Sequence, residues 1–240
     1  MNPLDTIAIA EKGALVVFVV LFAVWEIYRP ARPKRTTLKA FDLVAVLNVG
    51  VFSLVCKWAL TPSEGYAAAP LGALSLPLKI IAALIVIDFT LYWIHRAMHS
   101  SLLWNTHRFH HSIKEVNWLK GIYTSGTHIS MYIAPQILLG IYVFGFTRLE
   151  MALAFVIGYF VQLWQHANVS LPIGVLKYLF VTPQYHRRHH ALGKDMHDKN
   201  FGAILSVWDV LFGTYAEPSH ENYEFGVAEK VPVVRGLLGV

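Results

Sequence analysis

Histidines at helical spacing are the residues of this sequence with the clearest chemical potential. His95 and His99 are four residues apart, and residues three or four apart share one face of a helix. Two later clusters both have the spacing HxxHH, and one more histidine follows an apolar run between them. These nine residues are His95, His99, His107, His110, His111, His166, His186, His189 and His190. Neutral imidazole is the commonest metal ligand in proteins, so the pattern predicts a metal site.

The number and type of these donors restrict the kind of metal site. One ion takes roughly three to six donors, so the histidines predict two ions. The single cysteine, Cys56, lies in an apolar run, which excludes a thiolate zinc site. The clusters contain no carboxylate, which argues against the Glu-rich di-iron sites of helical bundles. The alternative is a set of histidines that only form hydrogen bonds at helix ends.

Carboxylates are expected near such a site, because nitrogen ligands leave the charge of the ions unneutralised. Asp88 is the strongest candidate, since it lies seven residues before His95 and therefore on the same helix face. It also lies inside an apolar run, where a charge is costly without a partner. A structural role in hydrogen bonding is the alternative for Asp88. Asp198 and Asp209 are weaker candidates.

Other polar residues near the clusters have simpler expected roles. His128, His197 and His220 have no partner at helical spacing. We keep His128 as a candidate ligand and consider the other two weaker. For the arginines between the histidines, contact with lipid phosphates is expected rather than catalysis. These arginines are Arg96, Arg108, Arg187 and Arg188.

The elements that must position these histidines are apolar helices. The sequence is 55% hydrophobic and 15% charged, against about a quarter charged in soluble domains, which predicts a membrane protein. A helix needs roughly 20 apolar residues to cross a bilayer. Five runs qualify or nearly qualify: Ala14 to Tyr28 (preceded by a weaker stretch, 7–10), Phe41 to Leu60, Leu71 to Ile94, Ile129 to Phe146 and Leu149 to Gln165. The last two form an expected tight hairpin.

Basic residues predict which side of the membrane holds the histidines. The connection 29–39 is rich in Arg and Lys, whereas the connection 61–70 has none, so the former is expected in the cytoplasm. The amino terminus then lies outside, without a removable signal peptide, and all histidine clusters are cytoplasmic. Beyond the last span we expect helices at 173–180 and 184–192, a loop at 193–200 and an amphipathic segment at 201–215. The tail 231–240 carries no clear signal.

Several motifs occur in a specific order along this chain. They are HRAMH, HRFHH and HRRHH, with WQHAN between the last two and DKNFGAILSVWDVLFGTY after them. This set closely resembles the fatty acid hydroxylase and sterol desaturase superfamily of membrane di-iron enzymes, over about residues 88–215. The resemblance implies O2-dependent oxidation of a lipid C–H bond at a histidine-ligated di-iron centre. It marks the nine patterned histidines as ligands.

Two positions depart from the family pattern. Some hydroxylases have a further histidine four positions before the one that matches His166, and here that position is Gln162. One iron is therefore expected to use water or Gln162. Other members place a histidine–proline pair in the loop after the second motif. Here SGTHIS keeps His128 without the proline.

The resemblance also implies cofactors and partners. These are two iron ions (Fe2+/Fe3+), O2 as co-substrate, a membrane lipid as substrate, and an external ferredoxin- or cytochrome b5-like electron donor with its reductase. Zinc in a purified sample would not exclude iron, because zinc binds such sites more tightly than ferrous iron. No nucleic-acid partner is expected. The oligomeric state does not follow from the sequence.

The expected fold is an all-α, multi-pass transmembrane bundle of about four to five spans with a cytoplasmic, helical, histidine-rich cap. We expect one integral-membrane domain over 1–240, with N-terminal spans in 1–70 and a catalytic region in 71–220. Asp88, Gln162 and Asp198 are the candidate catalytic residues besides the ligands. The alternative is a metal transporter or a zinc-dependent membrane hydrolase. Histidines on one side and the lack of a glutamate base in the clusters argue against both.

Overall fold

The described part of the chain is helical, which confirms the all-α class for those residues. The computed structural model describes residues 3–32, 40–61, 74–193, 196, 198–218 and 223–240. The α-helices are α1 (Pro3–Tyr28), α2 (Ala40–Leu60), α3 (Leu76–Met98), α4 (Trp104–His111), α5 (Gly126–Ile137), α6 (Arg148–His166), α7 (Pro183–His189), α8 (Val207–Leu211) and α9 (Val233–Leu238). Two 3-10 helices, η1 (Trp118–Ile122) and η3 (Gly174–Tyr178), and a π-helix, η2 (Leu138–Val143), complete the order.

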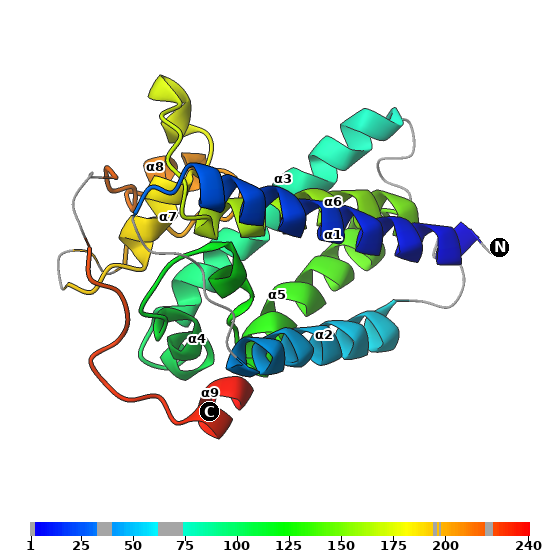
Figure 1. The fold of residues 1–240 in the computed structure, drawn as a ribbon. Coiled ribbons are helices and arrows are strands. Elements are labelled where there is room, and N and C mark those ends of the chain that lie inside the picture. Colours follow the sequence, from blue (N-terminus) through cyan, green and yellow to red (C-terminus); the bar gives the residue numbers. More distant parts are fainter. Residues whose placement is uncertain (1–2, 33–39, 62–73, 194–195, 197, 219–222) are drawn as a thin grey trace.

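The five longer helices form a bundle, and the short helices gather at one of its ends (Figure 1). Helix α2 packs on α5, α1 packs on α6, and α3 contacts both α5 and α6. Successive long helices run in opposite directions, so α1, α3 and α6 all end where α4, α7 and α8 lie. A buried apolar cluster of α3, α5, η2 and α6 joins the long helices. The bundle therefore brings the carboxyl ends of α3 and α6 to one place.

Helix α3 differs at both ends from the predicted run Leu71 to Ile94. It begins at Leu76, after the N-cap Ser75, with a proline in its first turn. Proline fits there because the first turn needs no N–H donor. The helix then continues to Met98, so His95 lies in its last turn and His99 is the C-cap. The extension places the first histidine motif on a rigid helix end.

The predicted hairpin of two apolar runs is present, but its first arm is not one regular helix. Helix α5 contains Pro135, which removes an internal N–H donor, and the π-helix η2 follows it. Gly145, at φ 70°, turns the chain, and Thr147 and Glu150 form a capping box at the start of α6. The sharp turn makes α6 return toward the histidine end.

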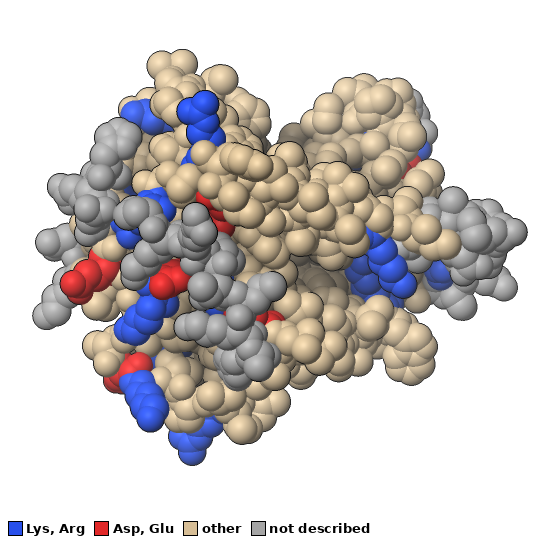
Figure 2. All heavy atoms as spheres, viewed as in Figure 1, with Lys and Arg blue, Asp and Glu red and all other residues tan. Residues whose placement is uncertain are grey.

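Two described helices are long and apolar enough to cross a membrane, Asp42–Leu60 and Leu76–Met98. The surface agrees with insertion of the bundle. Figure 2 shows most of the charged side chains of this face at the end with the short helices, and a smaller group of Lys or Arg side chains beyond the apolar middle, toward the other end. The number of spans remains a prediction. Three of the five basic residues on which the predicted sidedness depends, Lys34, Arg35 and Lys39, lie outside the described residues.

After α6 the chain folds more loosely than expected from sequence. The predicted helix 173–180 is the 3-10 helix η3, and the predicted helix 184–192 is the shorter α7. The predicted amphipathic segment 201–215 is mostly irregular, and α8 is its helical part. The carboxyl-terminal α9 packs on α4 and α5, although its sequence gave no clear signal. These segments enclose the histidine end of the bundle.

Candidate metal centre

Nine histidines from four helix ends converge into two groups in the structure. The groups are His95, His99, His107, His111 and His189 (the five-histidine group), and His110, His166, His186 and His190 (the four-histidine group). Within each group, one ring nitrogen of each residue lies within 4.8 Å of those of the others. All nine patterned histidines therefore lie together at one end of the bundle.

The two HxxHH motifs are each divided between the groups. On α4, His107 and His111 point to the five-histidine group and His110 to the four-histidine group. On α7 the division is reversed, since His189 joins the five-histidine group. Residues i and i+4 thus serve one group and residue i+3 the other. Each short helix lies between the two groups and contributes to both.

Backbone carbonyls fix the tautomers of two histidines in the four-histidine group. His110 Nδ1 lies 3.1 Å from the Tyr123 carbonyl oxygen, and His166 Nδ1 lies 2.9 Å from the Gln162 carbonyl oxygen. A carbonyl oxygen only accepts, so Nδ1 of each ring carries the proton and Nε2 has a lone pair. The two Nε2 atoms face each other at 3.2 Å. Two lone pairs at this distance repel, unless a cation lies between them.

The five-histidine group has the same arrangement. His95 Nδ1 donates to the Phe201 carbonyl oxygen and His189 Nδ1 to the Lys199 carbonyl oxygen, both at 2.8 Å. Nε2 of His95 therefore offers a lone pair, and it lies 3.0 Å from Nε2 of His107. Nε2 of His189 is buried and has no hydrogen-bond partner among the described residues. Ligating histidines usually donate their other N–H in this way.

The distances fit metal coordination better than a hydrogen-bond network. Neighbouring Nε2 atoms along His166, His186 and His190 are separated by 2.9 and 3.0 Å. Nitrogens about 2.1 Å from one ion and at right angles would be about 3.0 Å apart. The donor set is all imidazole, which suits iron, zinc, copper or nickel. Both groups therefore fit a metal ion.

Burial keeps the histidines of α4 and α7 neutral at pH 7. Their pKa values lie well below the ordinary histidine value, first because burial desolvates the charged form and second because neighbouring histidines repel it. The residues concerned are His107, His110, His111, His186, His189 and His190. Neutral imidazole is the form that binds metal, so the site is ready for it without losing protons.

His128 lies beside the metal groups but belongs to neither. Its Nδ1 atom is 3.1 Å from Nδ1 of His107, and its ring packs edge-to-face with that of Tyr132. His107 Nε2 points to His95 and His111, so His128 contacts the opposite nitrogen of the ring. His128 therefore contacts Nδ1 of His107 in the way that backbone carbonyl oxygens contact Nδ1 of four other histidines, His95, His110, His166 and His189. His197 and His220 lie outside the described residues.

Asp88 contacts a segment that lies far from it in the sequence. Its side chain is fully buried and accepts hydrogen bonds from the backbone N–H groups of Ile204 and Leu205 and from Nε1 of Trp208, at 2.7 to 2.9 Å. The carboxylate thus fastens the segment after α7 to the middle of α3, which is the structural role that the sequence offered as the alternative. A role of Asp88 beside the metal ligands stays a prediction.

The other two candidate carboxylates, Asp198 and Asp209, contact a patterned histidine directly or through one residue. Asp198 Oδ1 is 3.4 Å from Nδ1 of His99, although the Asp198 side chain is 70% exposed. Asp209 is fully buried and accepts from the backbone N–H of Phe201, whose carbonyl oxygen binds His95. Asp209 is therefore linked through Phe201 to His95 of the five-histidine group. The sequence had ranked it below Asp88.

Gln162 lies near the four-histidine group, but its amide is engaged elsewhere. Nε2 donates to the Gly121 carbonyl oxygen and Oε1 accepts from Gln165. Its backbone carbonyl is the acceptor for His166. Arg187 differs from its expected contact with lipid phosphates, because it is buried and donates to the carbonyl oxygens of Ala167 and Val169.

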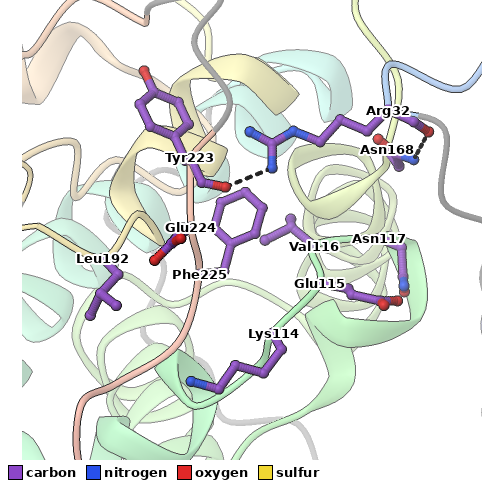
Figure 3. Close-up of a pocket in the computed structure, with 10 residues that line it drawn as sticks. All are labelled: Arg32, Lys114, Glu115, Val116, Asn117, Asn168, Leu192, Tyr223, Glu224 and Phe225. Atoms are coloured by element: carbon purple, nitrogen blue, oxygen red, sulfur yellow. Dashed lines mark hydrogen bonds between the residues drawn. The ribbon is translucent and has the colours of Figure 1, made fainter.

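Two cavities border the histidine groups, and a third lies away from them. A void of about 10 Å³ borders both groups and Tyr132 and is about the size of one water molecule. A cavity of about 570 Å³ reaches His99, His111 and His189 from the side of the short helices. Another of about 570 Å³, with no histidine in its lining, has Arg32 over the ring of Phe225 (Figure 3). Only the first two belong to the histidine site.

Comparison with known proteins agrees with this geometry. Residues 80–214, more than half of the chain, match the family model described as fatty acid hydroxylase. The chain is 29% identical to human alkylglycerol monooxygenase, over 62% of this chain and 33% of that protein. It is 32% identical to ornithine lipid hydroxylase OlsE of Rhizobium tropici, over 64% of this chain and 46% of that protein.

A more distant relative extends the comparison to other lipids. Methylsterol monooxygenase 1-2 of Arabidopsis thaliana is 25% identical, over 75% of this chain and 60% of that protein. The chain spans between a third and a half of the length of the two more similar relatives. No solved structure matches it.

Proposed function

The chain belongs to the fatty acid hydroxylase family, and from this membership we propose that it is a membrane enzyme that uses O2 to hydroxylate or desaturate a lipid. The observation that carries the proposal is the convergence of Nε2 lone pairs in two adjacent buried groups. We further propose that the nine histidines hold two iron ions, and that one integral-membrane domain spans the bilayer about four to five times with the site in the cytoplasm.

The proposed substrate class rests on the relatives and on the surface. The names of the relatives specify an alkylglycerol, an ornithine lipid and a methylsterol. In helix α2, only 6% of the apolar stretch within Asp42–Leu60 is buried, so this helix exposes a surface that suits lipid rather than water. A substrate dissolved in the bilayer can approach the bundle from the side. Reducing equivalents come from an external ferredoxin- or cytochrome b5-like protein with its reductase.

The residues of the chain have three tasks in the proposed reaction. When bound, the irons supply the two-electron redox chemistry with O2 that imidazoles cannot supply. The backbone carbonyls hold the imidazoles in the ligating tautomer. The small void beside Tyr132 and Ala203 gives both groups a common space that excludes bulk water. Binding energy from the rest of the lipid then places one methylene there.

Metal analysis and lipid mass spectrometry test this proposal together. Protein from iron-supplemented cells should contain about two irons per chain. His189→Ala and His166→Ala should each remove about one, because the two residues belong to different groups. A deletion strain should lack a lipid that differs from its precursor by one oxygen or two hydrogens. O2-independent hydrolysis, metal flux across vesicles, or undiminished metal in the double variant would contradict the proposal.

A further inference from the structure

The loop between α7 and α8 contacts the five-histidine group through its backbone. The carbonyl oxygen of Lys199 accepts from His189 and that of Phe201 accepts from His95. Both histidines belong to the same group. Residue 200, between these two carbonyls, therefore occupies a central position. We call residues 198–202 the carbonyl loop.

Asn200 holds the carbonyl loop in an unusual conformation. Its φ angle is 61° and that of Asp198 is 58°, in the left-handed region that asparagine and aspartate tolerate best among residues with side chains. The fully buried Asn200 amide donates to the carbonyl oxygens of Tyr185 and Ala216 and accepts from the backbone N–H of Ala216. The side chain thus uses both ends to tie the loop to α7 and to the segment after α8.

Asp209 holds the other end of the carbonyl loop. Its carboxylate accepts from the backbone N–H groups of Phe201 and Gly202, both at 2.8 Å, and from the hydroxyls of Tyr185 and Thr214. These four donors are directed at one fully buried group. Asn200 and Asp209 together leave the two carbonyls facing His189 and His95. The carbonyls that accept from the four-histidine group, those of Tyr123 and Gln162, lie elsewhere in the chain, just after η1 and within α6.

We propose that Asn200 and Asp209 are positioning residues for one of the two metal sites, the one formed by the five-histidine group. This inference rests on the proposed metal site and goes beyond it, because it assigns the carbonyl loop to one ion and not to the other. Substitution of either residue should weaken binding of one ion by about 10- to 100-fold, as expected for contacts that orient ligands. Binding of the second ion should be unchanged.

The test uses the full chain in detergent, with Co2+ as the metal probe. Wild type, Asn200→Asp and Asp209→Asn are titrated with Co2+ and compared for bound metal per chain and for visible absorption. Asn200→Asp keeps the size and the left-handed preference but removes the two amide donor bonds. His189→Ala and His166→Ala supply the reference spectra for loss of the five- and the four-histidine site.

The proposal predicts that both variants lose one Co2+ at metal concentrations that saturate wild type, and that the remaining spectrum matches that of His189→Ala. Two ions bound with wild-type affinity, or a spectrum that matches His166→Ala, would overturn it. If the His189→Ala and His166→Ala references themselves fail to lose one ion each, the ligand assignment fails instead. The two failures are therefore distinguishable.

A graded variant and a matched control exclude a general folding defect. Tyr185→Phe removes only the hydroxyl that donates to Asp209 and accepts from Gly202. It should weaken binding of the same single ion, but less than Asn200→Asp or Asp209→Asn does. Asn48→Asp also removes an amide that donates to two carbonyl oxygens, those of Thr124 and Leu237, but on α2. Asn48→Asp should bind the ion of the five-histidine group with wild-type affinity. Equal loss in Asn48→Asp and Asn200→Asp would overturn the proposal.

Discussion

At the residue scale, the pattern of neutral histidines gives this site its dependence on pH. In the folded protein the pKa values of the α4 and α7 histidines are lowered by burial, so protonation favours the unfolded chain. Their contribution to stability is complete above the unfolded histidine pKa of about 6.5 and is lost as the pH falls below it.

We therefore predict that the metal-free protein loses stability below about pH 6.5, by about 1.4 kcal/mol per pH unit for each histidine that titrates. Unfolding in detergent, followed from pH 8 to pH 5 (about three units), measures this slope. His186→Gln should make the slope shallower by about one proton, because His186 is one of the buried neutral groups. A slope that does not change in this variant would contradict the interpretation.

His128 illustrates a role that spacing alone does not reveal. Because His128 contacts Nδ1 of His107, we predict that His128→Ala lets the His107 ring rotate. The affinity for one metal ion should then fall by about 10- to 100-fold. His107→Ala, which removes a ligand, should abolish binding of that ion. Metal titration of the two variants distinguishes an orienting role of His128 from a role as a ligand. Complete loss of the ion in His128→Ala would instead make His128 a ligand.

At the element scale, the connection between α3 and the segment after α7 stabilises the site. Asp88 accepts three hydrogen bonds from Ile204, Leu205 and Trp208. We predict that Asp88→Asn destabilises the protein by roughly 2–4 kcal/mol, because the amide presents N–H to a buried donor. The thermal midpoint in detergent measures this. Thr90→Val, which loses only a bond within α3, should change stability by less than about 1 kcal/mol.

The close approach of η1 to α6 gives a second prediction at this scale. A Cβ atom on Gly121 would lie 2.9 Å from His166 Nδ1 and 3.1 Å from the Gln162 carbonyl oxygen. Gly121→Ala should therefore push His166 away from its acceptor and cost about 1–3 kcal/mol. Metal analysis should show loss from the four-histidine group alone. Loss from the five-histidine group would contradict this.

Elements also mark the limit of prediction from sequence. Apolar runs and HxxHH spacing predicted the long helices and the nine converging histidines, because both signals are local. The division of each motif between two groups depends on how α4 and α7 are oriented against each other. The need of Asp88 for a partner was predictable from its position inside an apolar run, but its partner lies more than 100 residues away. Asn200 gave no signal in the sequence, since its role depends on the left-handed backbone conformation that it adopts in the fold.

At the scale of the whole molecule, the arrangement of α3 predicts which side of the membrane each end faces. Ser75 precedes α3 and is exposed, and Leu102, just after it, is 85% exposed at the histidine end. In a Cys56→Ala background, Leu102→Cys should react with a membrane-impermeant maleimide only from the cytoplasmic side. Ser75→Cys should react only from outside. Labelling of both from one side would contradict the predicted sidedness.

The hydrogen bonds that orient His95, His110, His166 and His189 all end on main-chain oxygens. No point mutation deletes such an acceptor, because every amino acid supplies the same carbonyl. The side chain of Lys199 can therefore vary during evolution without changing the hydrogen bond that His189 makes. Ancestral reconstruction of this lineage should find that position variable, whereas residues that shape the path of the backbone stay fixed.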